Sequence, residues 1–174
     1  FLPDRWQNFI SWLKGEFGGE KEKEIASKVG YVFIVGDIIE GIGIFPGQEK
    51  ELTLPDIYDQ YKEAARYLAQ IPQDKKVILQ TGNHDACRIA EPQPRIYEDF
   101  AEDLYKIPNL SIVTNPCVIN IHRKGSFPGF DCLLYHGFSY THYCDTIASI
   151  KSSGLPISDR TGLIMKYLLQ RRHL

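Results

Sequence analysis

In Val77-Ile78-Leu79-Gln80-Thr81-Gly82-Asn83-His84-Asp85, a short apolar run passes directly into a cluster of polar residues. The run over 77–80 is too short for a helix and is typical of a buried strand. The residues after it offer an amide oxygen, an imidazole and a carboxylate. Open α/β sheets bind their ligands at the carboxyl ends of strands. The stretch therefore predicts a strand that leads into a functional loop.

Two other apolar runs end in the same way. The run Tyr31-Val32-Phe33-Ile34-Val35 is followed by Gly36-Asp37, and the run over 131–134 is followed by Tyr135-His136-Gly137. We expect the first run to be a strand covered on both faces, since β-branched and aromatic residues dominate it. Carboxylate, amide and imidazole groups at three strand ends suit Mn, Fe or Zn better than a thiolate site would.

The apolar pattern elsewhere predicts the elements around these ends. Trp6, Phe9, Ile10 and Leu13 fall on one face of a first helix, which Asp4 or the residues before it would cap. The segment 15–28, rich in Gly and charge, is expected to be an exposed loop or a helix end. Further helices are predicted over about 53–70, 97–104, 141–149 and 159–171, and strands over 110–113, 117–122 and 130–135. This order predicts an α/β sandwich that begins with parallel strands.

Composition bounds the class of protein. The 174 residues carry a formal net charge of −2, with 43% hydrophobic and 24% charged residues. These values indicate one globular domain over 1–174 and exclude wholesale disorder and a polycation that coats nucleic acid. No run of about 18 apolar residues is present, so no membrane span is expected.

The four cysteines are too far apart for a zinc knuckle, because no Cys-x-x-Cys pair is present. We expect reduced and mostly buried thiols in an intracellular, cytoplasmic protein. A dinucleotide loop at Gly41-x-Gly43 is rejected, because Asp37 and Glu40 would repel a pyrophosphate. A lone Gly-Asp or His-Gly is commonly only a turn, so the case depends on the three strand ends together.

These pieces resemble the calcineurin-like metallophosphoesterases, whose fold is two packed β-sheets flanked by helices and whose site holds two metal ions. The family pattern runs Asp-x-His, Gly-Asp, Gly-Asn-His-Asp/Glu, His and Gly-His-x-His, and this chain shows only the middle three. The stretches 33–48, 58–61, 82–88, 127–130, 134–138, 158–161 and 171–174 further resemble the small subunits of archaeal family-D DNA polymerases.

The resemblance implies a function in DNA replication. The complete protein would be a 3′–5′ exonuclease subunit that proofreads DNA 3′ ends and pairs with a large catalytic polymerase subunit. Two divalent ions, Mn above all, with Fe, Zn or Mg as alternatives, would act on the phosphodiester. Asp37 would bridge the two ions, and Asn83 and His136 would bind the second. His84 would face the scissile phosphate as a charge stabiliser or general acid.

Several neighbouring residues have lesser roles in this interpretation. We expect Asp85 to orient His84 or the loop, and Glu40 to be a loop or capping carboxylate. Tyr135, Tyr140 and Tyr143 would either stack on an unpaired base or pack at the edge of the core. The candidates for substrate binding are Tyr140, His142, Arg171 and Arg172. His122 and His173 carry no predicted role.

Two rival functions stay open. One is a non-catalytic scaffold of the kind found among accessory polymerase subunits, and the other is a phosphatase or phosphodiesterase that acts on another phosphoester. The presence of Asp37, Asn83, His84 and His136 favours activity. Because the first and last family motifs and an initiator Met are missing, we expect an internal piece of a longer protein. Such a piece would bind at most one metal ion, weakly, and hydrolyse DNA poorly.

Overall fold

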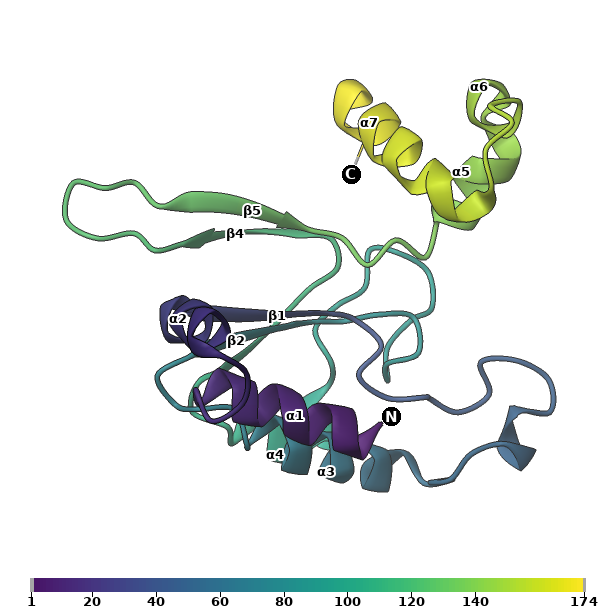
Figure 1. Ribbon diagram of the computed structural model, residues 1–174. Coiled ribbons are helices and arrows are strands. Elements are labelled where there is room, and N and C mark those ends of the chain that lie inside the picture. The colour runs from purple at the N-terminus through teal and green to yellow at the C-terminus, as the bar shows by residue number, and fades with distance from the viewer. Residues whose placement is uncertain (1, 174) are drawn as a thin grey trace.

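The computed structural model describes residues 2–173 and shows a mixed α/β chain built on a parallel sheet (Figure 1). The sheet contains β1 (Tyr31–Val35), β2 (Lys76–Gln80) and β3 (Leu110–Val113) in the order β1-β2-β3. Both pairings are parallel, and Val35 lies opposite Gln80 at the carboxyl ends of β1 and β2. The predicted strands and their parallel arrangement are confirmed.

One face of this sheet is covered by helices (Figure 1). They are α1 (Pro3–Leu13), α3 (Ile57–Leu68) and α4 (Glu98–Tyr105). The core between sheet and helices buries Ile10, Leu13, Tyr61, Leu68, Leu79 and Leu104, among others. Each such side chain contributes about 1.5–3 kcal/mol through removal from water. This core holds the carboxyl ends of β1 and β2 in place.

A hairpin lies over the other face of the sheet (Figure 1). It contains β4 (Cys117–Ile121) and β5 (Phe130–Leu134), which pair antiparallel. The N–H of His122 donates to the hydroxyl of Tyr31, 3.0 Å away, and so ties the hairpin to β1. The predicted α/β class is confirmed, while the complete metallophosphoesterase sandwich stays a prediction.

The last part of the chain forms a second, smaller core. It contains α5 (Tyr140–Thr146), α6 (Ala148–Lys151), the 3₁₀ turn η2 (Ile157–Arg160) and α7 (Thr161–Arg171). Cys144, Ile150, Ile164 and Leu168 are buried together there. The short 3₁₀ turn η1 (Gln48–Lys50) lies in the long loop after β1. Both predicted C-terminal helices are therefore present, the first ending near Thr146.

Two expectations are corrected. The segment 15–28 contains the helix α2 (Glu20–Lys28), because Ala26 is buried and the Glu22 carboxylate accepts a hydrogen bond from the Gly19 N–H. Strand β1 is half-buried, with Val35 41% exposed, because it is the outer strand of the sheet and the hairpin covers it incompletely. The N-cap position of α1 is occupied by Leu2, one of the residues before Asp4, as the second of the two expected possibilities had it.

Two further features concern the whole described range. All four cysteines are free, but only Cys144 is buried and the other three are half-buried, so the expectation of mostly buried thiols was wrong. Within residues 2–173, no helix is both long enough and apolar enough to cross a membrane.

Candidate metal centre at the strand ends

The three predicted ligands lie together at one edge of the sheet. Asp37 follows β1 and Asn83 follows β2, and these strands end side by side because they are parallel neighbours. His136 follows β5, and its Nδ1 is 2.7 Å from the carbonyl oxygen of Val35. A hydrogen bond from Nδ1–H to that carbonyl therefore anchors the imidazole to the end of β1.

This anchoring leaves Nε2 of His136 pointing at two oxygen atoms. It lies 3.0 Å from Oδ1 of Asn83 and 3.3 Å from Oδ2 of Asp37. With the proton on Nδ1, a neutral imidazole presents a lone pair at Nε2. Three lone-pair donors then face one another, an arrangement that a second proton on His136 or a cation between them would stabilise.

The pKa shifts of His136 and Asp37 are in the directions expected for two groups in such close contact. A hydrogen bond with Asp37 is the largest of the causes that raise the pKa of His136, and burial opposes it. Burial works against the charge of Asp37, but hydrogen bonds from His136 and from the His84 N–H outweigh it and lower the pKa of that carboxyl. Asp37 is therefore a carboxylate at neutral pH, as a metal-bridging ligand must be.

Two glycines allow the loops to approach so closely. Gly36 has a φ of +81°, and a Cβ there would lie 2.4 Å from Nδ1 of His136. A Cβ on Gly82 would lie 2.2 Å from Oδ1 of Asp37. Asp37 itself has a φ of 54°, a left-handed conformation that is uncommon outside glycine. The glycines in Gly36-Asp37 and Gly82-Asn83 are therefore required by packing.

A buried carboxylate joins the two loops. Oδ2 of Asp85 accepts hydrogen bonds from the N–H of Gly82, at 2.7 Å, and from the N–H of Asp37, at 3.1 Å. Asp85 is 3% exposed, and burial raises its pKa to about 6. Of the two roles expected for Asp85, the structure supports the orientation of the loop, because its bonds go to backbone groups rather than to the ring of His84.

His84 lies beside the three ligands without joining them. Its backbone N–H donates to Oδ1 of Asp37 at 2.9 Å, and its Nδ1 lies 2.9 Å from the carbonyl oxygen of Glu40. A proton on Nδ1 fits this contact and leaves Nε2 without a hydrogen-bond partner among residues 2–173. The side chain of Glu40 is exposed, so this residue contributes to the site through its backbone.

Two glutamines that carry no motif hold the loop that contains Glu40. Buried Gln60 accepts from the Gly41 N–H at 3.0 Å and donates to the carbonyls of Gly41 and Leu54. Buried Gln48 donates to the carbonyl of Glu40 at 2.9 Å. The sequence interpretation missed both, although Gln60 lies four residues before Ala64 on the buried face of α3 and so interrupts its apolar stripe.

The side chain of Asn115 holds the backbone of His136 in place, and the sequence interpretation did not identify it either. Its Oδ1 accepts from the N–H of His136 at 2.9 Å, and its Nδ2 donates to Oε1 of Gln93 at 2.5 Å. Asn115 and Gln93 are almost completely buried and also exchange backbone hydrogen bonds. A single polar residue between two strands gives no distinctive signal in a sequence.

Tyrosines close to the cluster have packing partners. The hydroxyl of Tyr135 donates to Glu91 at 2.6 Å, and its ring lies 5.3 Å from the ring of Tyr140. The hydroxyl of Tyr140 bonds the sulfur of Met165. His142 is exposed on α5, next to Tyr143. These contacts favour packing for Tyr140 and leave a role in binding untested.

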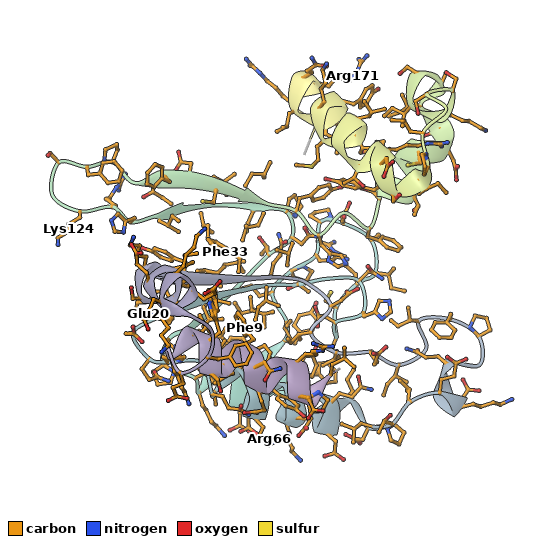
Figure 2. All side chains as sticks on the ribbon, viewed as in Figure 1. Phe9, Glu20, Phe33, Arg66, Lys124 and Arg171 are labelled. Atoms are coloured by element: carbon orange, nitrogen blue, oxygen red, sulfur yellow. The ribbon has the colours of Figure 1, made fainter. Side chains whose placement is uncertain are left out.

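The two predicted arginines lie away from the strand ends. Arg171 stacks over the ring of Tyr167, 4.5 Å from its centroid, at the outer end of α7 (Figure 2). Arg172 follows as the exposed C-cap residue of that helix. The structure therefore does not bring them to Asp37, Asn83 and His136, and their role in substrate binding stays a prediction.

The donor set of the cluster fits a divalent ion in part. A carboxylate, an amide oxygen and an imidazole are suitable ligands for Mn, Fe or Zn. Within residues 2–173, however, no group of three His, Cys, Asp or Glu side chains is placed to hold a metal ion. Only one carboxylate and one imidazole converge here, with the neutral amide of Asn83. Asp37, Asn83 and His136 are therefore the residues that could hold an ion here.

The curated proteins most informative about this chain share one name, DNA polymerase II small subunit. No protein-family model matches the chain. Over all 174 residues it is 42% identical to the DNA polymerase II small subunit of Methanothermobacter thermautotrophicus and 43% identical to that of Archaeoglobus fulgidus. The small subunit of Methanocaldococcus jannaschii is 41% identical over the same length. The chain spans 34%, 33% and 27% of these three proteins, so the similarity covers between about a quarter and a third of their length.

Proposed function

We propose, from the similarity of the whole chain to archaeal DNA polymerase II small subunits, that it forms part of such a subunit and carries a metal-dependent phosphodiesterase site. The reaction would be 3′–5′ exonucleolytic removal of nucleotides from DNA. The relatives' names support the polymerase role, and the strand-end cluster supports the hydrolytic one.

One observation carries the proposal of a metal site. Nε2 of His136, Oδ1 of Asn83 and Oδ2 of Asp37 face one another while Nδ1 of His136 is engaged with Val35. Lone pairs repel unless a positive charge lies between them. A divalent cation supplies that charge without requiring His136 to be protonated at neutral pH.

The chain's own residues would divide the work as follows. Asp37 contributes the negative charge, while Asn83 and His136 contribute neutral donors, so the cluster holds a cation without excess anionic repulsion toward a phosphodiester. When bound, divalent ions activate water and polarise the phosphoryl oxygens. His84, with Nδ1 held by the carbonyl of Glu40, presents Nε2 to the substrate. As an imidazolium, with a second proton on Nε2, it would stabilise developing negative charge or pass that proton to the departing 3′-oxygen and become neutral.

The number of metal ions that the chain could bind depends on how many side chains are available as ligands. Two ions are proposed for a complete small subunit, and these 174 residues alone would bind one, weakly. The single carboxylate and single imidazole of the cluster support this limit. Hydrolysis by these residues alone would accordingly be slow.

A large catalytic polymerase subunit is the proposed partner. With a net charge of −2, the chain has little non-specific electrostatic attraction for DNA phosphates. The partner would keep it near DNA 3′ ends. Tight binding of DNA by the small subunit alone, unaffected by salt, would contradict this part of the proposal.

A non-catalytic scaffold is the second candidate, because the described residues bring together only one carboxylate and one imidazole with the amide of Asn83, whereas the presence of all four predicted site residues favours the exonuclease. The deciding assay uses a small subunit that contains these residues, with Mn and labelled single-stranded DNA, beside an aryl phosphate. Shortening of the DNA from its 3′ end, lost on Asp37→Ala, supports the exonuclease. Absence of hydrolysis in the presence of bound Mn supports the scaffold. Hydrolysis of the aryl phosphate alone indicates a general phosphoesterase.

A further inference from the structure

A cavity of about 450 Å³ lies at the end of the sheet opposite to the strand-end cluster. It is open to solvent on one side and is bordered by the end of α1, by α2 and by the turn that precedes β2. Because α2 leads into the amino end of β1, the length of that strand separates the cavity from Asp37 by about 15 Å. Figure 1 shows α2 at that end of the sheet, and Figure 2 labels Glu20 at its start.

Positive charge predominates around this cavity. Lys14, Lys23 and Lys75 line it, against the single carboxylate of Asp74. Glu20 lies 3.7 Å from Lys23 but does not line the cavity, and its side chain is 97% exposed. This ion pair offsets part of the charge of Lys23, so three ammonium groups stand against the two carboxylates of Asp74 and Glu20. The three ammonium groups therefore leave an excess of positive charge.

Lys75 differs from the other lysines of the cavity because its side chain is buried. Its side chain is only 7% exposed, and lysines are rarely so buried without partners. The ammonium group has three N–H donors, yet its one carboxylate partner among residues 2–173 is Asp74, at 3.0 Å and itself 70% exposed. This leaves part of the donor capacity of the ammonium group unused, and Lys75 is among the residues that line the cavity.

The turn that carries Lys75 is held rigid. The N–H of Lys75 donates to the carbonyl of Pro72 at 3.0 Å. Nδ2 of the buried Asn109 donates to the carbonyls of Pro72, at 3.1 Å, and Lys75, at 2.8 Å. A binding group held in place before the ligand arrives loses less entropy on binding. Lys14 is the C-cap residue of α1, where a positive charge is favourable beside the helix dipole. This explanation does not extend to Lys23 or Lys75, which do not lie at that helix end.

We propose that this cavity is a phosphate-binding site. Its volume lies within the range of small-ligand sites, and lysine ammonium groups bind phosphate oxygens as point charges. A phosphate group offers several acceptor oxygens to the three lysines at once. It would belong either to a free phosphate or mononucleotide, or to the 5′ end of a DNA strand.

The test is a titration of the ¹⁵N-labelled chain with inorganic phosphate, followed by NMR at constant ionic strength and without divalent metal. Saturable shifts are expected for the amides of residues 13–15 and 72–76. Lys23→Gln should weaken binding by about 3- to 10-fold, as expected for loss of one charged contact. Lys21→Gln is the matched control, since Lys21 is exposed on the same helix and does not line the cavity. It should change the affinity less than about twofold.

Lys75→Met extends the test to the buried lysine, and the amide spectrum reports whether this variant is folded. If it is folded, it should bind phosphate at least as weakly as Lys23→Gln does. If it is not, the comparison of Lys23→Gln with Lys21→Gln still decides the question. Shifts that fail to saturate, or equal effects of those two substitutions, would overturn the proposal.

Two further ligand pairs identify the source of the phosphate. AMP is compared with adenosine, and a 5′-phosphorylated oligothymidylate with its 5′-hydroxyl form. Preference for the phosphorylated oligonucleotide supports a DNA 5′ end, whereas binding of AMP alone supports a mononucleotide. Equal binding of all four compounds, unaffected by Lys23→Gln, would contradict a phosphate site. Because no metal is used, this outcome is independent of the proposed nuclease.

Discussion

Gly82 packs so closely against Asp37 that a Cβ on Gly82 would lie 2.2 Å from Oδ1 and 2.4 Å from the backbone N of Asp37. Such a contact is far inside van der Waals distance, and one of the two loops must move if it is made. The position of the proposed bridging carboxylate therefore depends on the absence of a side chain in the neighbouring loop.

Gly82→Ala should accordingly displace Asp37. We expect a loss of about 1–3 kcal/mol in the free energy of unfolding, the usual range for overpacking, together with weakened Mn binding. Urea denaturation and a Mn titration measure the two effects. Gly30→Ala is the control, because a Cβ there meets nothing within 4 Å. Unchanged Mn affinity in folded Gly82→Ala would show that this contact does not position Asp37.

Removal of the Gln60 side chain should loosen the loop after β1. Gln60→Ala leaves the buried N–H and carbonyl of Gly41 without their side-chain partner, at a cost of about 1–3 kcal/mol in unfolding free energy. Gln73→Ala, at an exposed position, should change stability by less than about 0.5 kcal/mol. Equal urea midpoints for the two variants would contradict the role assigned to Gln60.

The thiol of Cys87 should be slow to react. Burial, and next the charge of Asp85, raise its pKa to about 11 from 9.0. At pH 8 the thiolate fraction falls by about 100-fold, and the greater nucleophilicity of a more basic thiolate restores about tenfold of that. Alkylation by iodoacetamide, mapped by mass spectrometry, should therefore be about tenfold slower than in an unfolded cysteine peptide.

The pH dependence gives a second check on Cys87. Its alkylation rate should keep rising up to about pH 11, because the thiolate becomes the main form only there. A rate that levels off near pH 9 would show that the environment of Cys87 is not as described. Asp85→Asn should move the rise to lower pH, since it removes a neighbouring negative charge.

His84→Ala separates catalysis from metal binding. No side-chain contact joins the ring of His84 to Asn83 or His136, so Mn affinity should remain within about twofold. Hydrolysis by a small subunit that contains these residues should fall by about 10²–10⁴, the usual effect of losing a general acid. Loss of Mn from His84→Ala, with Asn83 intact, would instead make His84 a ligand.

The sequence predicted the parts of the structure that local pattern controls. Strands β1 and β2 were recognisable as continuous apolar runs, and their parallel pairing brings Asp37 and Asn83 to one edge. Helix α2 was missed because its residues are mostly charged and only Ala26 is buried. The exposure of β1 depends on how much of it the hairpin of residues 117–134 covers. The residues of β1 themselves carry no information about that contact.

The same limit applies to the site. Short motifs identified Asp37, Asn83 and His136, because glycines and strand ends mark them. The sequence could not predict the supporting roles of Gln48, Gln93 and Asn115. The role of such a polar side chain is apparent only when its buried hydrogen-bond partners are known. The arginines at the end of α7 were chosen by charge alone, and tertiary packing carries them away from the cluster.

The most direct measurement is a Mn titration of the 174-residue chain by electron paramagnetic resonance. The account predicts one weak site that Asp37→Ala and His136→Ala each weaken by at least about tenfold, since each removes one of few ligands. Asp145→Ala, at an exposed position on α5, should leave it unchanged. Two tight Mn sites, or binding that survives both Asp37→Ala and His136→Ala, would contradict the single, incomplete metal centre proposed at the strand ends.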